Sequence, residues 1–251
     1  MIPEQRQRRL LDRAAADGAV SVAGLADEWG VSRETIRRDI AELARQGLLV
    51  KTHGGAVPLL APEPAPDMRR ASNPQGKARI GRAAAALVPA GASVILDSGS
   101  TTAAVAASLA GRPGLTVYTS DLGIARTLHR GGARVHLLGG LLDDGGEATG
   151  GLDALDMLAR YHADFAFVGA GGLTVDGALT DFTREGAALR AAMLARGAAA
   201  YAVLDRDKFA RVTAVEIAGF GGGAGLITDA APPPGLAARL DDLGIAVTVA
   251  P

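Results

Sequence analysis

The sequence predicts a two-domain protein, in which a small α+β domain precedes a larger α/β domain with a mostly parallel sheet. Three observations predict this organisation. Two short helical patterns meet at a tight turn at Gly30. Residues 57–76 then hold five of the chain's 12 prolines, and from Lys77 short apolar runs alternate with helical stretches, as in βαβ units. The expected division is a first domain over residues 1–57, a linker over residues 58–76 and a second domain over residues 77–251.

Composition limits the function classes without choosing among them. The chain has 251 residues and a net charge of −1, so DNA binding cannot be argued from bulk charge. The absence of cysteine excludes disulfides and thiolate metal sites, and we expect neither a metal nor a cofactor. There is no run of about 18 apolar residues and no signal-peptide pattern. We therefore expect a soluble cytoplasmic protein with no membrane partner.

The first 30 residues predict two helices. Residues 4–16, EQRQRRLLDRAAA, place Leu10 and Ala14 on one inward face. Residues 22–29, VAGLADEW, predict a second, shorter helix that ends at the turn made by Gly30. Two short helices joined by a tight turn that contains glycine form the helix-turn-helix pattern, if a third helix follows.

The third helix opens at Ser32, a good N-cap, and carries apolar residues at Ile36, Ile40 and Leu43, spaced four and three. Asp39 is expected to pair with an arginine. The other face of the first turns carries donors that suit phosphates and base edges in a major groove. An arginine-rich helix is more often only a solvated face. The preceding helix, the turn and the segment that follows together favour the DNA interpretation.

A β-hairpin is expected after Gly47. Residues 48–51 are strand-like, and Gly54 and Gly55 form a turn, which predicts a two-stranded wing resting on the DNA backbone. The expected DNA-binding residues are Ser32, Arg33, Thr35, Arg37, Arg38, Lys51 and His53.

The proline-rich segment 57–76 is expected to be extended and to carry no core. Arg69 and Arg70 lie within it. Contact with DNA or with the second domain is one interpretation of these two arginines, and solvated linker charge is the favoured one.

In the second domain, parallel strands predict a ligand site in the loops at their carboxyl ends. The first such loop, Asp97 to Thr102, follows the strand SVIL and opens an alanine-rich helix. Amides at a helix N-terminus together with hydroxyl donors suit a phosphate group. The loop lacks the Gly-Lys-Ser/Thr ending of a Walker P-loop. An ordinary N-cap rich in serine and threonine explains its spacing equally well.

Later loops repeat this pattern of small and polar residues at strand ends. Together they offer hydroxyls, amides, carboxylates such as Asp205 and one lysine around one sheet edge, which suits a small phosphorylated polyol. The expected ligand-binding residues are Asp97, Ser98, Gly99, Ser100, Thr101, Thr102, Thr119, Ser120, Gly139, Gly140, Glu185 and Lys208.

Residues 31–56 resemble the DeoR family of bacterial transcriptional regulators. They contain its Val-Ser-x-x-Thr-Ile-Arg-Arg-Asp run, the Gly-Leu-Leu that follows and the His-Gly-Gly-Ala wing. The resemblance continues through the Asp-Ser-Gly-Ser-Thr-Thr loop at residues 97–102, Gly139-Gly140, the Asp-x-x-Phe-x-Gly run at residues 164–169 and the Asp-x-x-Lys run at residues 205–208. The chain departs from the family pattern at Ser120, where asparagine is frequent, and at Gly76, where glutamate commonly precedes the lysine.

The resemblance implies a second domain similar to ribose-5-phosphate isomerase in fold. It further implies a DNA-binding repressor of a carbohydrate-metabolism operon, a phosphorylated sugar as effector, double-stranded operator DNA as partner, and a homo-oligomer. Two alternatives remain at this point. One is a sugar-phosphate isomerase-like enzyme with a DNA-binding appendage, in which Asp97, Asp176, Glu185 and Lys208 supply acid and base groups. The other is a pure oligomerisation module with a closed pocket.

Overall fold

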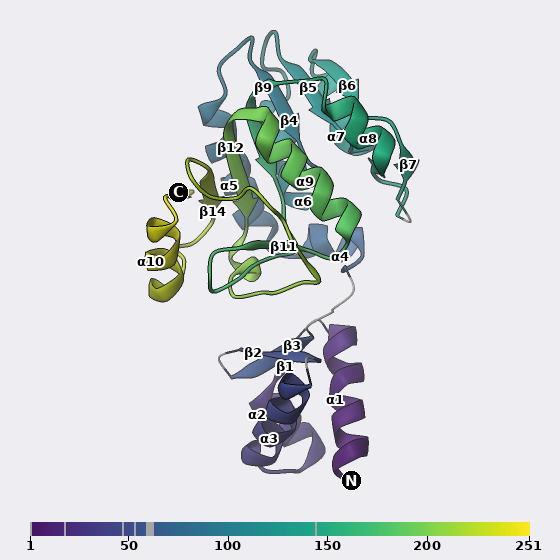
Figure 1. Ribbon diagram of the computed structural model, residues 1–251, viewed down its shortest axis with the longest axis vertical. Coiled ribbons are helices and arrows are strands. Elements are labelled where there is room, and N and C mark those ends of the chain that lie inside the picture. Colours follow the sequence, from purple (N-terminus) through teal and green to yellow (C-terminus); the bar gives the residue numbers. More distant parts are fainter. Residues whose placement is uncertain (1, 18, 47, 53, 59–62, 144) are drawn as a thin grey trace.

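The computed structural model describes residues 2–17, 19–46, 48–52, 54–58, 63–143 and 145–251 (Figure 1). These residues form a small N-terminal domain and a larger α/β domain, as the sequence predicts. Gly47 and His53 of the predicted DNA-binding region, and residues 59–62 of the predicted linker, lie outside the described residues. Within the described ranges, no helix has both the length and the apolar character needed to span a bilayer.

The N-terminal domain packs three helices against a small antiparallel sheet. Its elements are α1 (Pro3–Asp17), β1 (Val20–Ser21), α2 (Val22–Trp29), α3 (Arg33–Arg45), β2 (Leu49–Thr52) and β3 (Gly55–Pro58). Ile36, Ile40 and Leu43 of α3 are buried, so its predicted inward face is confirmed. They pack with Leu10 of α1 and Leu25 of α2 in one apolar cluster. The three predicted helices are therefore present with nearly the expected bounds.

The wing has three strands in the order β1-β3-β2, one more than expected. Strand β1 is only two residues long, which is too short for a sequence pattern to reveal. Its pairing with β3 explains Gly55, because a Cβ on Gly55 would lie 1.9 Å from the carbonyl oxygen of Val20. Gly55 thus brings the wing close to the helices, and a residue with a side chain would push β1 and β3 apart.

Asp39 was predicted to pair with an arginine, and the structure identifies that arginine as Arg6, on α1. Asp39 is 3 % exposed, and its Oδ1 accepts a hydrogen bond from Arg6 Nη2 at 3.1 Å, while its Oδ2 accepts from Arg6 Nε. Gln7 Nε2 donates to the same carboxylate at 3.2 Å. Asp39 therefore holds α1 against α3 and does not face solvent.

Residues 57–76 were expected to be extended, but part of this segment is helical. Residues Pro66–Ala71 form helix α4, and α5 (Pro74–Leu87) begins three residues before Lys77. Proline occupies the first helical position of each, where its missing N–H costs nothing and its fixed φ favours the helix. The prolines therefore mark helix starts here.

A seven-stranded sheet forms the centre of the α/β domain, in the order β15-β14-β12-β9-β4-β5-β6. Every pairing in it is parallel. Its strands are β4 (Ser93–Leu96), β5 (Thr116–Thr119), β6 (Arg134–Leu137), β9 (Ala163–Val168), β12 (Gly197–Leu204), β14 (Gly225–Thr228) and β15 (Ala246–Val249). The predicted α/β class with a mostly parallel sheet is confirmed.

Helices cover both faces of this sheet. Alternate residues of β4 point to opposite faces, since Val94 and Leu96 belong to one apolar cluster and Ile95 to the other. The first cluster includes residues of α5, α6 and α7, and the second includes residues of α8, α9 and α10. The remaining bounds are α6 (Ser100–Leu109), α7 (Leu122–Arg130), α8 (Leu152–Leu158), α9 (Arg184–Arg196) and α10 (Pro234–Asp242).

Short antiparallel strands surround the carboxyl edge of the sheet. They are β7 (Leu141–Leu142) with β8 (Thr149–Gly150), and β10 (Gly172–Leu173), β11 (Leu179–Asp181) and β13 (Val215–Glu216). Strand β13 pairs with β11 in the smaller sheet, although residues 213–220 are as apolar as the runs that form the large sheet. Two- and three-residue strands leave too short a pattern to place from sequence.

Candidate functional site

The topology of the large sheet selects one point on its edge. From β4 the chain builds the sheet outward through β5 and β6 on one side, and later through β9, β12, β14 and β15 on the other. The crevice between β4 and β9 is therefore a topological switch point, where ligands bind in open α/β sheets. Asp97 directly follows β4 and Gly169 directly follows β9, and the Gly169 amide donates to Asp97 Oδ2 at 2.9 Å.

The loop Ser98–Thr102 leads from this crevice into α6. Gly99 is the N-cap of α6, with a φ of 135°, and no side chain caps the helix. Thr102 Oγ1 donates to the carbonyl oxygen of Gly99 at 2.9 Å, which fixes the turn. The first amides of a helix have no acceptor within it, so the amides of residues 100–102 remain available to a ligand. The loop therefore offers backbone amides and hydroxyl groups that a phosphate group could use.

Three adjoining cavities meet at Gly99 and Arg69. The inner pocket, about 40 Å³, lies between the 98–102 loop and Lys208. The outer cleft, about 720 Å³, opens between Asp97 and the β7–β8 hairpin, and the side cleft, about 550 Å³, lies beside α7. The outer cleft is large enough for a small organic ligand, and the inner pocket admits only a small group.

A largely buried arginine pairs with the two carboxylates of the site. Arg190, on α9, donates from Nε to Asp97 Oδ2 at 2.8 Å and from Nη1 to Asp181 Oδ2. Burial lowers the pKa of Arg190, but the charges of Asp97 and Asp181 outweigh it and raise that pKa. Burial raises the pKa of Asp97, and Arg190 opposes this shift. The three side chains form a compact ionic cluster at the base of the cavities.

Lys208 is a largely buried cation at the inner pocket. It follows β12 in a short 3₁₀ helix, η1 (Arg206–Lys208), and lines the inner pocket. Burial lowers its pKa to about 8, and the neighbouring charges of Arg211, Lys77 and Arg69 add to this, while Asp205 opposes it. Within the described part of the chain, no carboxylate lies close enough to Lys208 to form an ion pair. An anion in the inner pocket would stabilise its charged form.

The structure brings most of the expected ligand residues together. The 98–102 loop and Lys208 line the inner pocket, and Asp97, Ser120 and Glu185 line the outer cleft. The Oγ atom of Ser120 is buried and has no hydrogen-bond partner in the described structure, so it is a donor that a ligand could use.

Three expected residues lie outside the cavity linings. Thr119 is fully buried, and its Oγ1 accepts a hydrogen bond from the Asp121 amide at 3.1 Å. Gly139 and Gly140 follow β6 beyond the crevice, where a Cβ on Gly140 would lie 2.2 Å from the Gly150 carbonyl oxygen. Gly140 therefore allows close packing against β8.

Sequence reasoning missed Asp181 and Arg190 and dismissed Arg69. Arg69 was interpreted as solvated linker charge, yet it lines all three cavities. Asp181 ends the short strand β11, and Arg190 lies in the middle of an alanine-rich helix. The available signal was an arginine placed among the alanines and leucines of the helix interior, because a cation packed there requires charged partners.

The N-terminal domain presents a second candidate surface. Ser32 caps α3, where its Oγ accepts a hydrogen bond from the Thr35 amide at 3.1 Å. Arg37 and Arg38 are exposed and lie 3.8 Å from Glu34 carboxylate oxygens, so they are only loosely held. Exposed donors also occur at Arg33, on the same helix, and at Lys51, on β2.

A winged helix-turn-helix domain joined to an α/β domain with a polar cavity at its switch point defines a transcription regulator with a separate sensor domain. The chain belongs to the DeoR family. The model of the DeoR-like helix-turn-helix domain matches residues 6–59, and the model of the DeoR C-terminal sensor domain matches residues 72–230. The family predicted from residues 31–56 is thereby confirmed, and the protein is a DNA-binding transcriptional regulator.

Similar proteins match over nearly the whole chain. The glycerol-3-phosphate regulon repressor of Escherichia coli K12 is 33% identical over 236 residues, which cover 91% of this chain and 92% of that protein. The transcriptional regulator GolR of Listeria innocua is 31% identical over 253 residues, which cover 100% of both. Among solved structures, ribose 5-phosphate isomerase A of Methanocaldococcus jannaschii matches 55% of each chain at 17% identity, with a TM-score of 0.42.

Proposed function

We propose that this regulator represses a carbohydrate-metabolism operon and that a phosphorylated sugar, bound at the switch point, changes its affinity for operator DNA. The observation that carries this proposal is the inner pocket, where an uncapped helix N-terminus faces a lysine without an ion pair. Such a pocket suits a phosphate group. The outer cleft beside it offers Ser120 and Glu185 to hydroxyl groups.

A gel-shift titration tests the proposal. The protein is mixed with a duplex from the region upstream of its own gene, in the presence of glycerol, pentose or hexose phosphates or of their unphosphorylated forms. We expect one phosphorylated compound to change operator affinity about 5- to 150-fold, while its unphosphorylated form has little effect. If no phosphorylated sugar alters the affinity, the sensor part of the proposal is wrong.

The site favours a sensor over an isomerase. Of the four groups considered for acid–base chemistry, Asp176 lies in the exposed turn between β10 and β11 and does not line the cavities. Asp97 is held by Arg190 and by the Gly169 amide, so it is poorly placed to accept a substrate proton. We therefore propose that the protein is not an enzyme, and a ketose–aldose conversion assay with the purified protein tests this.

We further propose that the regulator acts as a homo-oligomer, because paired half-sites in an operator require paired recognition helices. Leu141 and Leu152 are 80% and 79% exposed near the β7–β8 hairpin, and Leu142 is also exposed. Exposed apolar groups of this kind support self-association at that edge. Sedimentation of the wild type and of Leu152→Asp at matched concentrations tests the proposal, since the variant is expected to dissociate more readily.

Substitution of Gly99 is expected to abolish the effector response while DNA affinity remains. With a φ of 135°, any side chain at this position is strained, at a cost of about 1–3 kcal/mol. A Cβ alone would make only an ordinary contact, 3.7 Å from Thr102 Oγ1, so Gly99→Ala measures strain and Gly99→Val adds bulk at the pocket. Calorimetric effector binding and anisotropy with operator DNA distinguish the two effects. Equal loss of both activities in Gly99→Val would mean that the fold had failed.

The affinity for a phosphorylated effector is expected to fall about tenfold between pH 7 and pH 9. Burial lowers the pKa of Lys208 to about 8, so the charged form becomes scarce as pH rises through this range. A bound phosphate raises that pKa, so binding is linked to proton uptake and weakens with rising pH. A phosphate monoester is already dianionic above pH 7. Isothermal titration at several pH values measures this slope, and Lys208→Arg is expected to flatten it.

A further inference from the structure

The short helix α4 contributes a cation to all three cavities. Arg69 lines the inner pocket, the outer cleft and the side cleft. Its Nη1 donates to Glu63, whereas its Nε is buried without a hydrogen-bond partner in the described ranges. Burial is the main cause of the lowered pKa of Lys208, and the nearby charge of Arg69 adds to it. An anion received by both cations would relieve their repulsion and give the Arg69 side chain a stronger acceptor.

Polar contacts, and not a core, hold α4 in place. None of its six residues is buried, and no side chain caps its first turn. On one side Arg70 Nη1 donates to Glu147, between β7 and β8, at 2.7 Å. An element without buried apolar contacts has low local stability, so a modest change in polar contacts is enough to move it.

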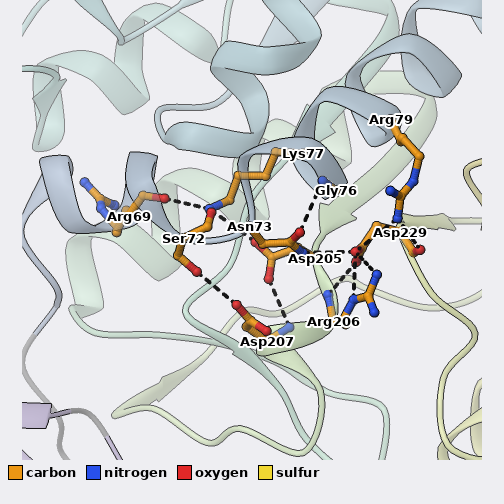
Figure 2. A network of polar contacts seen from close by, with 10 residues as sticks. All are labelled: Arg69, Ser72, Asn73, Gly76, Lys77, Arg79, Asp205, Arg206, Asp207 and Asp229. Carbon is orange, nitrogen blue, oxygen red and sulfur yellow. Dashed lines mark hydrogen bonds and ion pairs between the residues drawn. The ribbon is translucent and has the colours of Figure 1, made fainter.

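A buried lysine ties α4 to the loop that carries Lys208 (Figure 2). Lys77, on α5, is 5% exposed, and its Nζ donates to the carbonyl oxygens of Arg69, at 2.6 Å, and Ser72. The same Nζ lies 3.3 Å from Asp205 Oδ2. Ser72 Oγ also donates to Asp207 Oδ2 at 2.9 Å. The end of α4 and residues 205–208 are therefore joined by two separate contacts, so a displacement of one segment also moves the other.

The base of this junction is firmly held. Asn73, with a φ of 45°, caps α5, and its Nδ2 donates to Asp229 Oδ2 at 3.0 Å. Arg206 also binds Asp229, through its amide at 2.8 Å and through Nε and Nη2 at 2.8 and 2.7 Å. A Cβ on Gly76 would lie 2.5 Å from Asp229 Oδ2, so the packing here is close. Motion of α4 relative to α5 is thus confined to the residues before Asn73.

We propose that Arg69 is an effector-binding residue and that α4 carries the occupancy of the effector site to the DNA-binding domain. This inference rests on the proposed function. A phosphorylated effector held by the 98–102 loop and Lys208 also engages Arg69, replaces Glu63 as its acceptor and shifts α4. In the sequence, seven residues separate α4 from β3 of the wing, so the shift changes the arrangement of the α3 helices that meet DNA. Lys208 binds the same anion from the core side, on the loop after β12, and its link to the wing runs through α4.

The test separates effector binding from coupling. The full-length wild type is compared with Arg69→Gln, Lys208→Gln and the control Arg82→Gln, which removes an exposed arginine of α5. Calorimetry measures the Kd of the phosphorylated sugar found by the gel shift, or of inorganic phosphate if none is found. Anisotropy measures operator affinity without effector and at saturating effector. Thermal unfolding confirms that each variant is folded, and Arg69→Lys serves as a second variant that retains the charge.

We expect both Arg69→Gln and Lys208→Gln to weaken effector binding about 10- to 100-fold, as for the loss of a hydrogen bond to a charged group. At saturation, Lys208→Gln should recover the wild-type change in operator affinity, whereas Arg69→Gln should retain little of it. Arg69→Lys should fall between Arg69→Gln and the wild type, and Arg82→Gln should match the wild type. If Arg69→Gln binds the effector normally, or couples fully once saturated, the inference is wrong and the proposed function stands. If the wild type itself binds no phosphorylated compound, both fail.

Discussion

Replacement of Arg190 by methionine is expected to lower the Tm of the sensor domain by about 10 °C at neutral pH. Methionine keeps most of the apolar volume but removes the charge that pairs with Asp97 and Asp181. Both carboxylates are at most 3% exposed, and removal of one partner from a buried pair costs about 3–5 kcal/mol. For a domain of this size, 1 kcal/mol corresponds to about 2–4 °C. Scanning calorimetry of the full chain measures the shift.

The loss of stability in Arg190→Met is expected to be larger at neutral pH than at acidic pH. Without Arg190, the folded-state pKa of Asp97 lies further above its unfolded value, because burial already raises that pKa and the charge of Arg190 no longer opposes the shift. Groups of that kind favour folding at low pH and lose that contribution as pH rises through their folded pKa. The deficit of Arg190→Met should therefore narrow as pH falls toward about 4.

Two controls make the result specific. Arg196→Met removes an arginine from the last turn of the same helix, where its Nη1 contacts His162 at the surface, and should change the Tm little. Addition of Asp97→Asn and Asp181→Asn to Arg190→Met should restore most of the stability, because neutral amides carry no unpaired charge. A Tm for Arg190→Met close to that of the wild type would show that the cluster does not stabilise the fold.

The sequence predicted the parts of this molecule that local periodicity controls. The faces of α1, α2 and α3 follow from a 3.6-residue repeat, and the strands of the parallel sheet follow from short apolar runs between helices. The loop after β4 was identified because a strand end and a helix start are both visible in the sequence. These features depend on neighbours within about ten residues.

Features that depend on distant partners were not predictable. Arg190 is significant because Asp97 lies beside it, 93 residues earlier in the chain, and Lys77 is significant because it meets Asp205. A sequence pattern gives no such pairing, so Arg69 was interpreted as solvent-exposed charge. The prolines of residues 57–76 were ambiguous for a local reason, since proline favours both extended segments and first helical turns.

Replacement of Arg37 by alanine is expected to weaken operator binding by about 1–3 kcal/mol for each recognition helix that contacts DNA, so by twice that for a dimer on two half-sites. Arg37 lies on the exposed side of α3, and its Nη1 is 3.8 Å from the Glu34 carboxylate. Little ion-pair energy is therefore lost when the Arg37 side chain turns toward DNA. If it binds a phosphate, the slope of log K against log salt should decrease by about one for each such contact. Arg45→Ala is the matched control, because Arg45 lies in the last turn of α3 and binds Glu42 at 2.6 Å. Anisotropy titrations at several salt concentrations measure both quantities. An equal loss for Arg45→Ala would indicate a general effect of charge, whereas a loss confined to Arg37→Ala, with a flatter salt dependence, would place the start of α3 at the DNA backbone.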